Sequence, residues 1–306
     1  MNVSRQCFKI IILVACIALG FIIFSASKNK LMKSGLATNQ NPILSSVFSA
    51  IGSSAVENDT ITCIKECPAS MLYRTLCPCL NKKLNRLMKT LGSIQYDVAA
   101  DRRSLREYID HSLLLEEEAL TAENIADIEH ASLFAEKLKL HQFNVETLLT
   151  IHRIALAQDS KIAGKIRSHP MFVPKGPGDI FLRMPEPEEL DISLENYFRW
   201  FHSELEQKST HPIVFAAMAK LLFIRIHPFS DGNGRVSRIL LNVILRKTLL
   251  PFWTFIPSNE ITKYYNVIGD VEERLNLVPY LSYVITCIER SLTLYLEDQK
   301  NQRIEL

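Results

Sequence analysis

The segment from Ile226 to Arg238, IHPFSDGNGRVSR, gathers residue types that handle protons and phosphate. His227 can accept a proton near neutral pH. Pro228 ends the apolar run before it, and a Gly-Asn-Gly loop then leads into a helix that we expect to begin at about Asn233. The first N–H groups of a helix are unpaired and lie at the positive end of its dipole, so this helix start predicts an anion site.

Three charged side chains surround the expected helix start. Arg235 and Arg238 are three positions apart, so they share one helix face and can bind further phosphate oxygens. Asp231 beside an anion site indicates a cation between the two negative groups, and Mg²⁺ suits both carboxylate and phosphate oxygens. Each part alone is commonly a helix stop, a turn or a solvated helix face. Their joint spacing predicts a Mg-nucleotide site with His227 as the general base.

The segment HPFSDGNGRVSR resembles, without departure, the signature H-x-F-x-D/E-G-N-G-R-x-x-R of the Fic family. The resemblance implies that His227 deprotonates a Ser, Thr or Tyr hydroxyl of a target protein. That oxygen would attack the α-phosphorus of ATP and expel pyrophosphate, with Asp231 holding the Mg²⁺. The implied nucleotide-binding residues are an anion hole of Gly232, Asn233 and Gly234, with Asn233 on the α-phosphate, and Arg235 and Arg238 on the outer phosphates. Phe229 would anchor the loop in the core.

Two further segments resemble the same family. Tyr264 and Tyr265 are similar to a tyrosine pair that packs on adenine, while Glu272 stands where the family has a base-binding asparagine. Residues 164–167 (GKIR), ahead of a proline-rich stretch, are similar to the family's G-x-x-R and its target-positioning hairpin. This resemblance places Phe172 and Val173 on a flap beside the site.

Residues 112–117 (SLLLEE) resemble the family's inhibitory motif S/T-x-x-x-E-G/N, with Glu117 at the last position. The resemblance implies that Glu116 pairs with Arg238 and blocks the place of the γ-phosphate. A solvated acidic helix face is the alternative interpretation. In relatives that remove AMP the same glutamate positions the attacking water, so removal of AMP is a second implied activity.

The fold predicted for residues 82–298 is all-α, because apolar residues recur at helical spacing from about Leu84 onward. The resemblance implies a Fic-type helical bundle. Residues 168–187 break the pattern with five prolines and two glycines around two β-prone runs, which predicts a short β-hairpin flap. The expected helices span 82–94, 102–117, 122–138, 144–156, 188–206, 211–226, 232–248, 259–270 and 277–298.

The N-terminal residues 1–34 include an uncharged apolar run, Ile10 to Ala26, with basic residues on both sides. Its length is at the short end of what crosses a bilayer, so it predicts a single transmembrane signal anchor. A cleaved signal peptide, and hence a secreted protein, is the alternative. Residues 35–81 form a linker and a segment whose clustered cysteines favour two disulfides in an oxidising compartment over zinc or free thiols. These cysteines are Cys63, Cys67, Cys77 and Cys79.

The net charge of +2 is too small to indicate a nucleic-acid partner. Cys287 lies in an apolar stretch and is expected in the core. In layout the chain is similar to the endoplasmic-reticulum Fic enzymes of animals, which carry tetratricopeptide repeats where this chain has its cysteine segment. That resemblance implies a lumenal Hsp70 chaperone as substrate. The clustered cysteines favour a catalytic domain on the lumenal side, and a homodimer is one expected assembly. Transfer of UMP or phosphocholine, and a non-catalytic lumenal binding protein, remain open alternatives.

Overall fold

The computed structural model describes residues 78–174, 181–208, 210–274 and 276–305. The predicted anchor at 1–34 and most of the segment 35–81, with Cys63, Cys67 and Cys77, lie outside the described residues, as do the side chains of Cys79 and Glu272. In the part of the chain that is described, no helix combines the length and the apolar character that a bilayer crossing needs.

The described chain is mostly helical, with one two-stranded sheet. Its α-helices are α4 (Pro78–Leu91), α5 (Val98–Leu114), α6 (Ala122–Lys137), α7 (Val145–Ala155), α8 (Leu190–Gln207), α9 (Pro212–Ile226), α10 (Asn233–Thr248), α11 (Ile261–Arg274) and α12 (Leu277–Glu305). Short 3₁₀ turns are η3 (Leu140–Gln142), η4 (Pro187–Glu189) and η5 (Ser258–Glu260), and the strands are β1 (Phe172–Pro174) and β2 (Phe181–Arg183).

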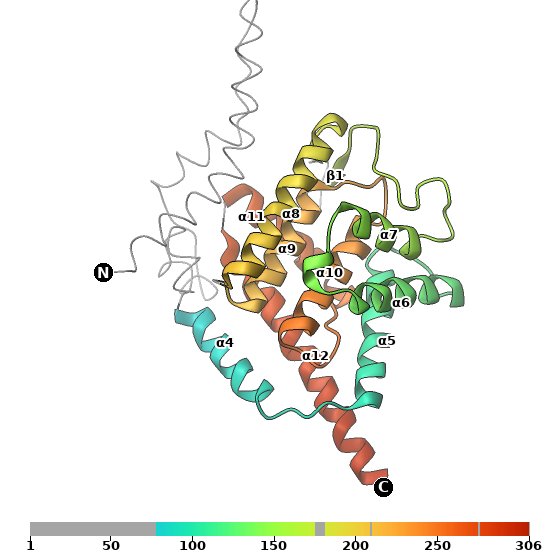
Figure 1. The fold of residues 1–306 in the computed structure, drawn as a ribbon. Coiled ribbons are helices and arrows are strands. Elements are labelled where there is room, and N and C mark those ends of the chain that lie inside the picture. The colour runs from blue at the N-terminus through green and yellow to red at the C-terminus, as the bar shows by residue number, and fades with distance from the viewer. Residues whose placement is uncertain (1–77, 175–180, 209, 275, 306) are drawn as a thin grey trace, which may run out of the picture.

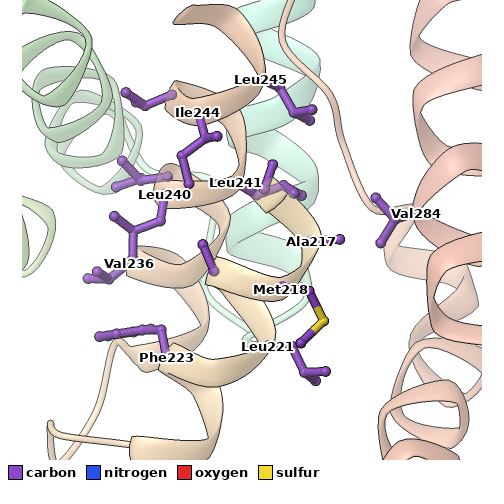
Figure 2. Packing of buried hydrophobic residues seen from close by; sticks show 14 of the residues in the cluster. Ala217, Met218, Leu221, Phe223, Val236, Leu240, Leu241, Ile244, Leu245 and Val284 are labelled. Carbon is purple, nitrogen blue, oxygen red and sulfur yellow. The ribbon is translucent and has the colours of Figure 1, made fainter. Parts of the chain in front are cut away.

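The centre of the bundle is the pair α9 and α10, which pack against each other and around which the other helices are arranged (Figure 1). Helix α9 is apolar on nearly all sides. A helix of this kind is stable only in the interior, and most residues of α9 are buried. Figure 2 shows Phe223 of α9 on the same side as Val236 and Leu240 of α10, while Ala217, Met218 and Leu221 lie on the side of Val284 of α12. This packed pair fixes the position of the short loop that joins the two helices.

The folded unit extends past both expected boundaries. Helix α4 begins at Pro78, the first described residue, and Leu80 is 1% exposed in the main core. The predicted boundary at residue 82 therefore falls inside α4. At the other end α12 continues to Glu305 instead of ending at 298. The prediction of a packed Cys287 is confirmed, since its side chain is 1% exposed.

The expected helices are present, with one difference that concerns the site. Helix α5 ends at Leu114, so Glu116 lies in a turn after the helix instead of on it. The N–H of Glu118 donates to Leu113 O at 3.1 Å and the N–H of Glu117 to Leu114 O at 3.3 Å, which is a Schellman pattern. Glu117 takes the left-handed position of this motif, with φ of 59°. The helical spacing of the sequence continues through this turn and therefore conceals it.

The predicted hairpin flap is confirmed as an antiparallel pair of strands. Phe172 faces Arg183 and Val173 faces Leu182 in the register. Beyond the strands, the N–H of Met184 donates to Met171 O at 2.9 Å, so the pairing continues toward the base of the hairpin.

Candidate active site

His227 ends α9 in a left-handed conformation, with φ of 50° and ψ of 57°. Its Nδ1 lies 3.2 Å from Ile224 O. A carbonyl oxygen only accepts, so the proton of the neutral ring belongs on Nδ1 and the lone pair on Nε2. Burial lowers the pKa of His227, and the positive charge of Arg167 lowers it further. The ring is therefore neutral at neutral pH, with Nε2 ready to accept a proton.

The loop between α9 and α10 is braced by Asn233. Its Oδ1 accepts the N–H of Phe229 at 3.0 Å, and its Nδ2 donates to Phe229 O at 2.7 Å. The Phe229 ring is fully buried, as expected for a loop anchor. The Asn233 side chain is thus committed to the loop backbone. Of its groups, the main-chain N–H in the first turn of α10 is the one placed for an anion.

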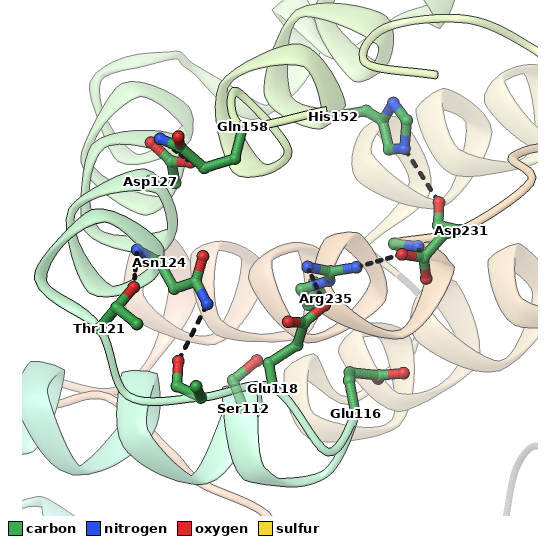
Figure 3. A network of polar contacts seen from close by, with 12 residues as sticks. Ser112, Glu116, Glu118, Thr121, Asn124, Asp127, His152, Gln158, Asp231 and Arg235 are labelled. Carbon is green, nitrogen blue, oxygen red and sulfur yellow. Dashed lines mark hydrogen bonds and ion pairs between the residues drawn. The ribbon is translucent and has the colours of Figure 1, made fainter. Parts of the chain in front are cut away.

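His152 of α7 is a fully buried brace of the same loop that the sequence analysis did not single out. Its Nδ1 accepts the N–H of Gly164 at 2.8 Å and its Nε2 donates to Asp231 O at 3.0 Å (Figure 3). Its ring stacks on Phe229 at a centroid distance of 3.7 Å. Burial lowers the pKa of His152 to about 4, so the ring stays neutral. Its one signal in the sequence is a histidine on the apolar face of the expected helix 144–156.

The start of α10 has room for a compact anion. Gly232 has φ of 77°, and the first helical hydrogen bond is donated by Val236 to Gly232 O, so the N–H groups between them precede the helix's own bonds. A Cβ built on Gly234 would lie 2.0 Å from Oε1 of Glu116. The Glu116 carboxylate therefore sits against the bare Cα of Gly234, at the positive end of the helix.

Arg238 holds that carboxylate in place. It is 3% exposed, and its Nη2 donates to Glu116 Oε1 at 2.7 Å. The same guanidinium donates to Ser112 Oγ and Ser112 O, both at 2.8 Å. Burial lowers the pKa of Arg238, but the Glu116 carboxylate, with smaller contributions from Tyr264 and Tyr108, outweighs it and the pKa is raised. The first and fifth residues of the segment 112–117 thus both bind Arg238.

Arg235 binds two carboxylates at once (Figure 3). Its Nη2 donates to Asp231 Oδ2 at 2.6 Å and its Nη1 to Glu118 Oε1 at 3.2 Å. The Asp231 side chain is 53% exposed, so it can reach a metal ion beside the helix start. Among the described residues no cluster of three His, Cys, Asp or Glu could hold a metal. A single carboxylate fits Mg²⁺, which takes most of its ligands from phosphates and water.

The two tyrosines differ in their surroundings. Tyr264 is 4% exposed and packs in a small core with Leu115, and its hydroxyl accepts from Nζ of Lys220 at 2.5 Å. The buried Lys220 has its pKa lowered to about 7 by desolvation, with Arg238 adding to the effect. Tyr265 is 42% exposed and is the one of the pair with an accessible ring. Tyr264 is therefore part of the core in this structure, and of the two tyrosines predicted to pack on adenine Tyr265 is the one that offers an exposed ring.

The flap carries Phe172 and Val173, and Arg167 connects the base of the flap to the backbone of His227. Phe172 is 53% exposed and Val173 half-buried. Arg167, at the base of the flap, donates from Nε to His227 O at 2.7 Å. The sequence indicated Arg167 through its G-x-x-R context, without showing what the guanidinium binds.

Residues 142–245 match the model of the Fic/DOC family. The chain contains a Fic domain. It is similar to the protein adenylyltransferase Fic of Drosophila ananassae, 28% identical over 247 residues, and to that of Drosophila persimilis, 31% identical over 215 residues. These matches cover 70% and 69% of this chain but 47% and 37% of the relatives, so the chain spans less than half their length.

The fold is also that of Fic proteins of known structure. A Fic-domain signalling protein from Bacteroides thetaiotaomicron matches with a TM-score of 0.63 and 22% identity, over 72% of this chain and 97% of its own. The segment that resembles the Fic signature, residues 226–238, forms the α9–α10 loop and helix start described above, which α7 and the turn after α5 contact.

Proposed function

We propose that this protein transfers AMP from Mg-ATP to Ser, Thr or Tyr hydroxyl groups of target proteins. The observation that carries the proposal is the carboxylate of Glu116 at the start of α10, bound by Arg238 at 2.7 Å. A carboxylate held between a buried guanidinium and a helix N-terminus occupies an anion-binding position, and a phosphate group can bind at the same position. The curated relatives named above are protein adenylyltransferases, which supports AMP as the transferred group.

His227 has the geometry of a general base for this reaction. Its Nδ1–H is engaged by Ile224 O, so Nε2 takes the proton from the target hydroxyl. The hydroxyl oxygen forms a bond to the α-phosphorus as the bond from that phosphorus to pyrophosphate breaks. The first-turn N–H groups of α10 stabilise the charge that builds on the α-phosphate oxygens.

The outer phosphates need the two arginines and a metal ion. Arg238 and Arg235 would bind them once the acids now paired with these side chains have moved. Asp231 would hold Mg²⁺, which neutralises phosphate charge when bound. Tyr265, with its accessible ring, would pack on the adenine.

The turn after α5 inhibits the enzyme in this proposal. Glu116 occupies Arg238, and Glu118 shares Arg235 with Asp231, so both arginines of the site carry an acid from the same turn. Binding of ATP with its outer phosphates on Arg238 requires Glu116 to leave. With Glu116 in place, the same carboxylate can position a water that attacks the phosphorus of protein-bound AMP, so that the bond to the modified side-chain oxygen breaks and AMP and the free hydroxyl are released.

The cellular setting follows from the N-terminal sequence and the resemblance. We place the protein in the endoplasmic-reticulum membrane, held by residues 10–26, with the Fic domain in the lumen. A lumenal Hsp70 chaperone is the proposed substrate and a homodimer the proposed assembly. A form without the anchor would be secreted.

The donor is tested with the full chain carrying Glu116→Gly, so that the arginines are free. The protein is incubated with ATP, UTP, GTP or CDP-choline, each labelled in the group that would be transferred. Protein-bound label from ATP is the expected result. Label from one of the other donors alone would replace AMP with that group, and label from none would leave the non-catalytic binding protein as the better account.

A further inference from the structure

Arg167 is a buried arginine whose side chain binds only main-chain carbonyls among the described residues. It is 3% exposed. Its Nε donates to His227 O at 2.7 Å, its Nη1 to His169 O at 2.8 Å and its Nη2 to Pro185 O at 2.6 Å. Its own N–H donates to Pro228 O at 2.9 Å. Arg167 therefore donates four hydrogen bonds to three segments, which contain His169, Pro185 and the pair 227–228.

Two of those segments are the ends of the flap. His169 precedes β1 and Pro185 follows β2, so the two Nη groups of Arg167 bridge the two ends of the hairpin. The pairing of Met184 with Met171 lies next to this closure, on the side of the strands. The guanidinium is a planar fork, and it can reach carbonyls in different directions where a lysine ammonium acts from a single point.

The third segment carries the proposed base. His227 has φ of 50°, a left-handed conformation that a residue with a side chain adopts at a cost. The Nε bond to His227 O and the backbone bond to Pro228 O fix the peptide groups that follow this residue. The direction of the imidazole depends on that backbone. Arg167 therefore touches both the base of the flap and the backbone that aims the ring.

We propose that Arg167 is a positioning residue that sets the flap and His227 in one fixed relation, so that a target hydroxyl laid along the flap meets Nε2. The inference rests on the proposed function, since it assigns the flap to the target and His227 to the base. Arg167 does not touch the nucleotide site. Its loss acts on the transfer step and leaves ATP binding in place.

The charge of Arg167 also acts on the His227 ring. After burial, the charge of Arg167 is the main influence that lowers the pKa of His227, while Glu116 and Asp231 act in the opposite direction. Removing the charge raises the pKa of His227, so a larger fraction of the ring is protonated at a given pH. The acid limb of the transfer rate then moves to higher pH.

The test compares Arg167→Lys and Arg167→Met in the full chain carrying Glu116→Gly, with Arg246→Lys as the matched control. Arg246 is also a mostly buried arginine, but it binds Asp101 and Glu136 at the junction of α10 with α5 and α6, away from the flap. Three quantities are measured in each protein: kcat and KM for ATP in AMP transfer, the pH profile from 5 to 8, and amide hydrogen exchange.

We expect kcat to fall by roughly ten- to a hundredfold in both Arg167 variants while KM for ATP changes by less than about threefold. Arg167→Met should also shift the acid limb to higher pH, which Arg167→Lys, retaining the charge, should not. Amides of residues 171–173 and 182–184 should exchange faster in both variants and at the parental rate in Arg246→Lys.

Unchanged flap exchange in the Arg167 variants overturns the positioning role, whether or not the parent is active. A rise in KM for ATP that matches the fall in kcat would also overturn the positioning role. Absence of AMP transfer in the Glu116→Gly parent itself, with faster flap exchange in the Arg167 variants, would instead overturn the proposed function and leave the structural link standing.

Discussion

Oε1 of Glu116 lies 2.0 Å from where a Cβ on Gly234 would be, so any other residue at 234 would displace the carboxylate. The same bare Cα that admits this carboxylate would admit a phosphate oxygen. The contact joins a turn after α5 to the first turn of α10, more than a hundred residues apart in the chain. In the proposed function, access of a phosphate group and inhibition by Glu116 therefore depend on the same small volume beside Gly234.

Glu116→Gly should raise self-labelling from ATP by roughly ten- to a hundredfold. The reason is the charged hydrogen bond to Arg238, which is worth about 1.5–3 kcal/mol and must be broken before a phosphate can take its place. Glu117→Gln is the matched control, because Glu117 is exposed in the same turn and forms no ion pair with another described residue. The measurement is the initial rate of protein labelling. Equal rates in Glu116→Gly and the parent would mean that Glu116 is only surface charge.

Glu118→Gln should raise the same rate by no more than about fivefold. Its ion pair with Arg235 is partly solvated, with 36% of the Glu118 side chain exposed, and such pairs contribute up to about 1 kcal/mol. Arg235 also keeps its bond to Asp231 in the variant. Labelling rates of Glu118→Gln, Glu116→Gly and the double variant give the result. An increase as large as that of Glu116→Gly would make Glu118 the main inhibitory residue.

The residues proposed to bind phosphate could be located from the sequence because they are contiguous. Residues 226–238 fold as one loop and one helix start, so their spacing alone places them together. The partners of that loop could not be predicted in the same way. His152 and Arg167 reach it across the bundle, and only the packing of α7 and the flap base decides which backbone groups they bind.

Local pattern also left two details of the site undetermined. Helical spacing continued through Glu116 and Glu117, whereas the chain leaves the helix at Leu114 through a Schellman turn with a left-handed glutamate. The side chains of the adjacent residues Tyr264 and Tyr265 lie in different surroundings, one buried and one exposed. Tyr264 joins a small core with Leu115, which no spacing within α11 could reveal.

His152 should make the free energy of unfolding depend on pH. Its pKa is lowered to about 4 in the folded protein from an ordinary 6.5, so the unfolded chain binds a proton that the folded one refuses between these values. The stability that this group contributes is fully present above pH 6.5 and is lost as pH falls toward 4. The loss amounts to roughly 3 kcal/mol.

Denaturant unfolding at pH 7.5, 6.0 and 4.5 tests this dependence in the parent and in His152→Asn. Asparagine keeps a donor and an acceptor but does not titrate, so the variant should be less stable at pH 7.5 and lose less stability on acidification. The other histidines are common to both proteins and cancel in the comparison. Parallel losses in the two proteins would show that His152 is not responsible.

Tyr265→Ala should raise KM for ATP, since the accessible ring is the proposed packing surface for the base. Stacking of a base on an aromatic ring is worth about 1–3 kcal/mol, which corresponds to roughly five- to a hundredfold. Tyr264→Phe should instead lower stability, because Nζ of the buried Lys220 loses its hydroxyl partner. Both are measured in the Glu116→Gly protein. A larger change in KM from Tyr264→Phe than from Tyr265→Ala would reverse the assignment.

The central claim is tested most directly by the position of the label in ATP. The full chain with Glu116→Gly is incubated with ATP labelled at the α-phosphate or at the γ-phosphate, beside the same protein carrying His227→Ala. We predict protein-bound label from the α-position only, and none in His227→Ala although that variant still binds ATP. Label from the γ-position, or undiminished transfer without His227, would contradict the account.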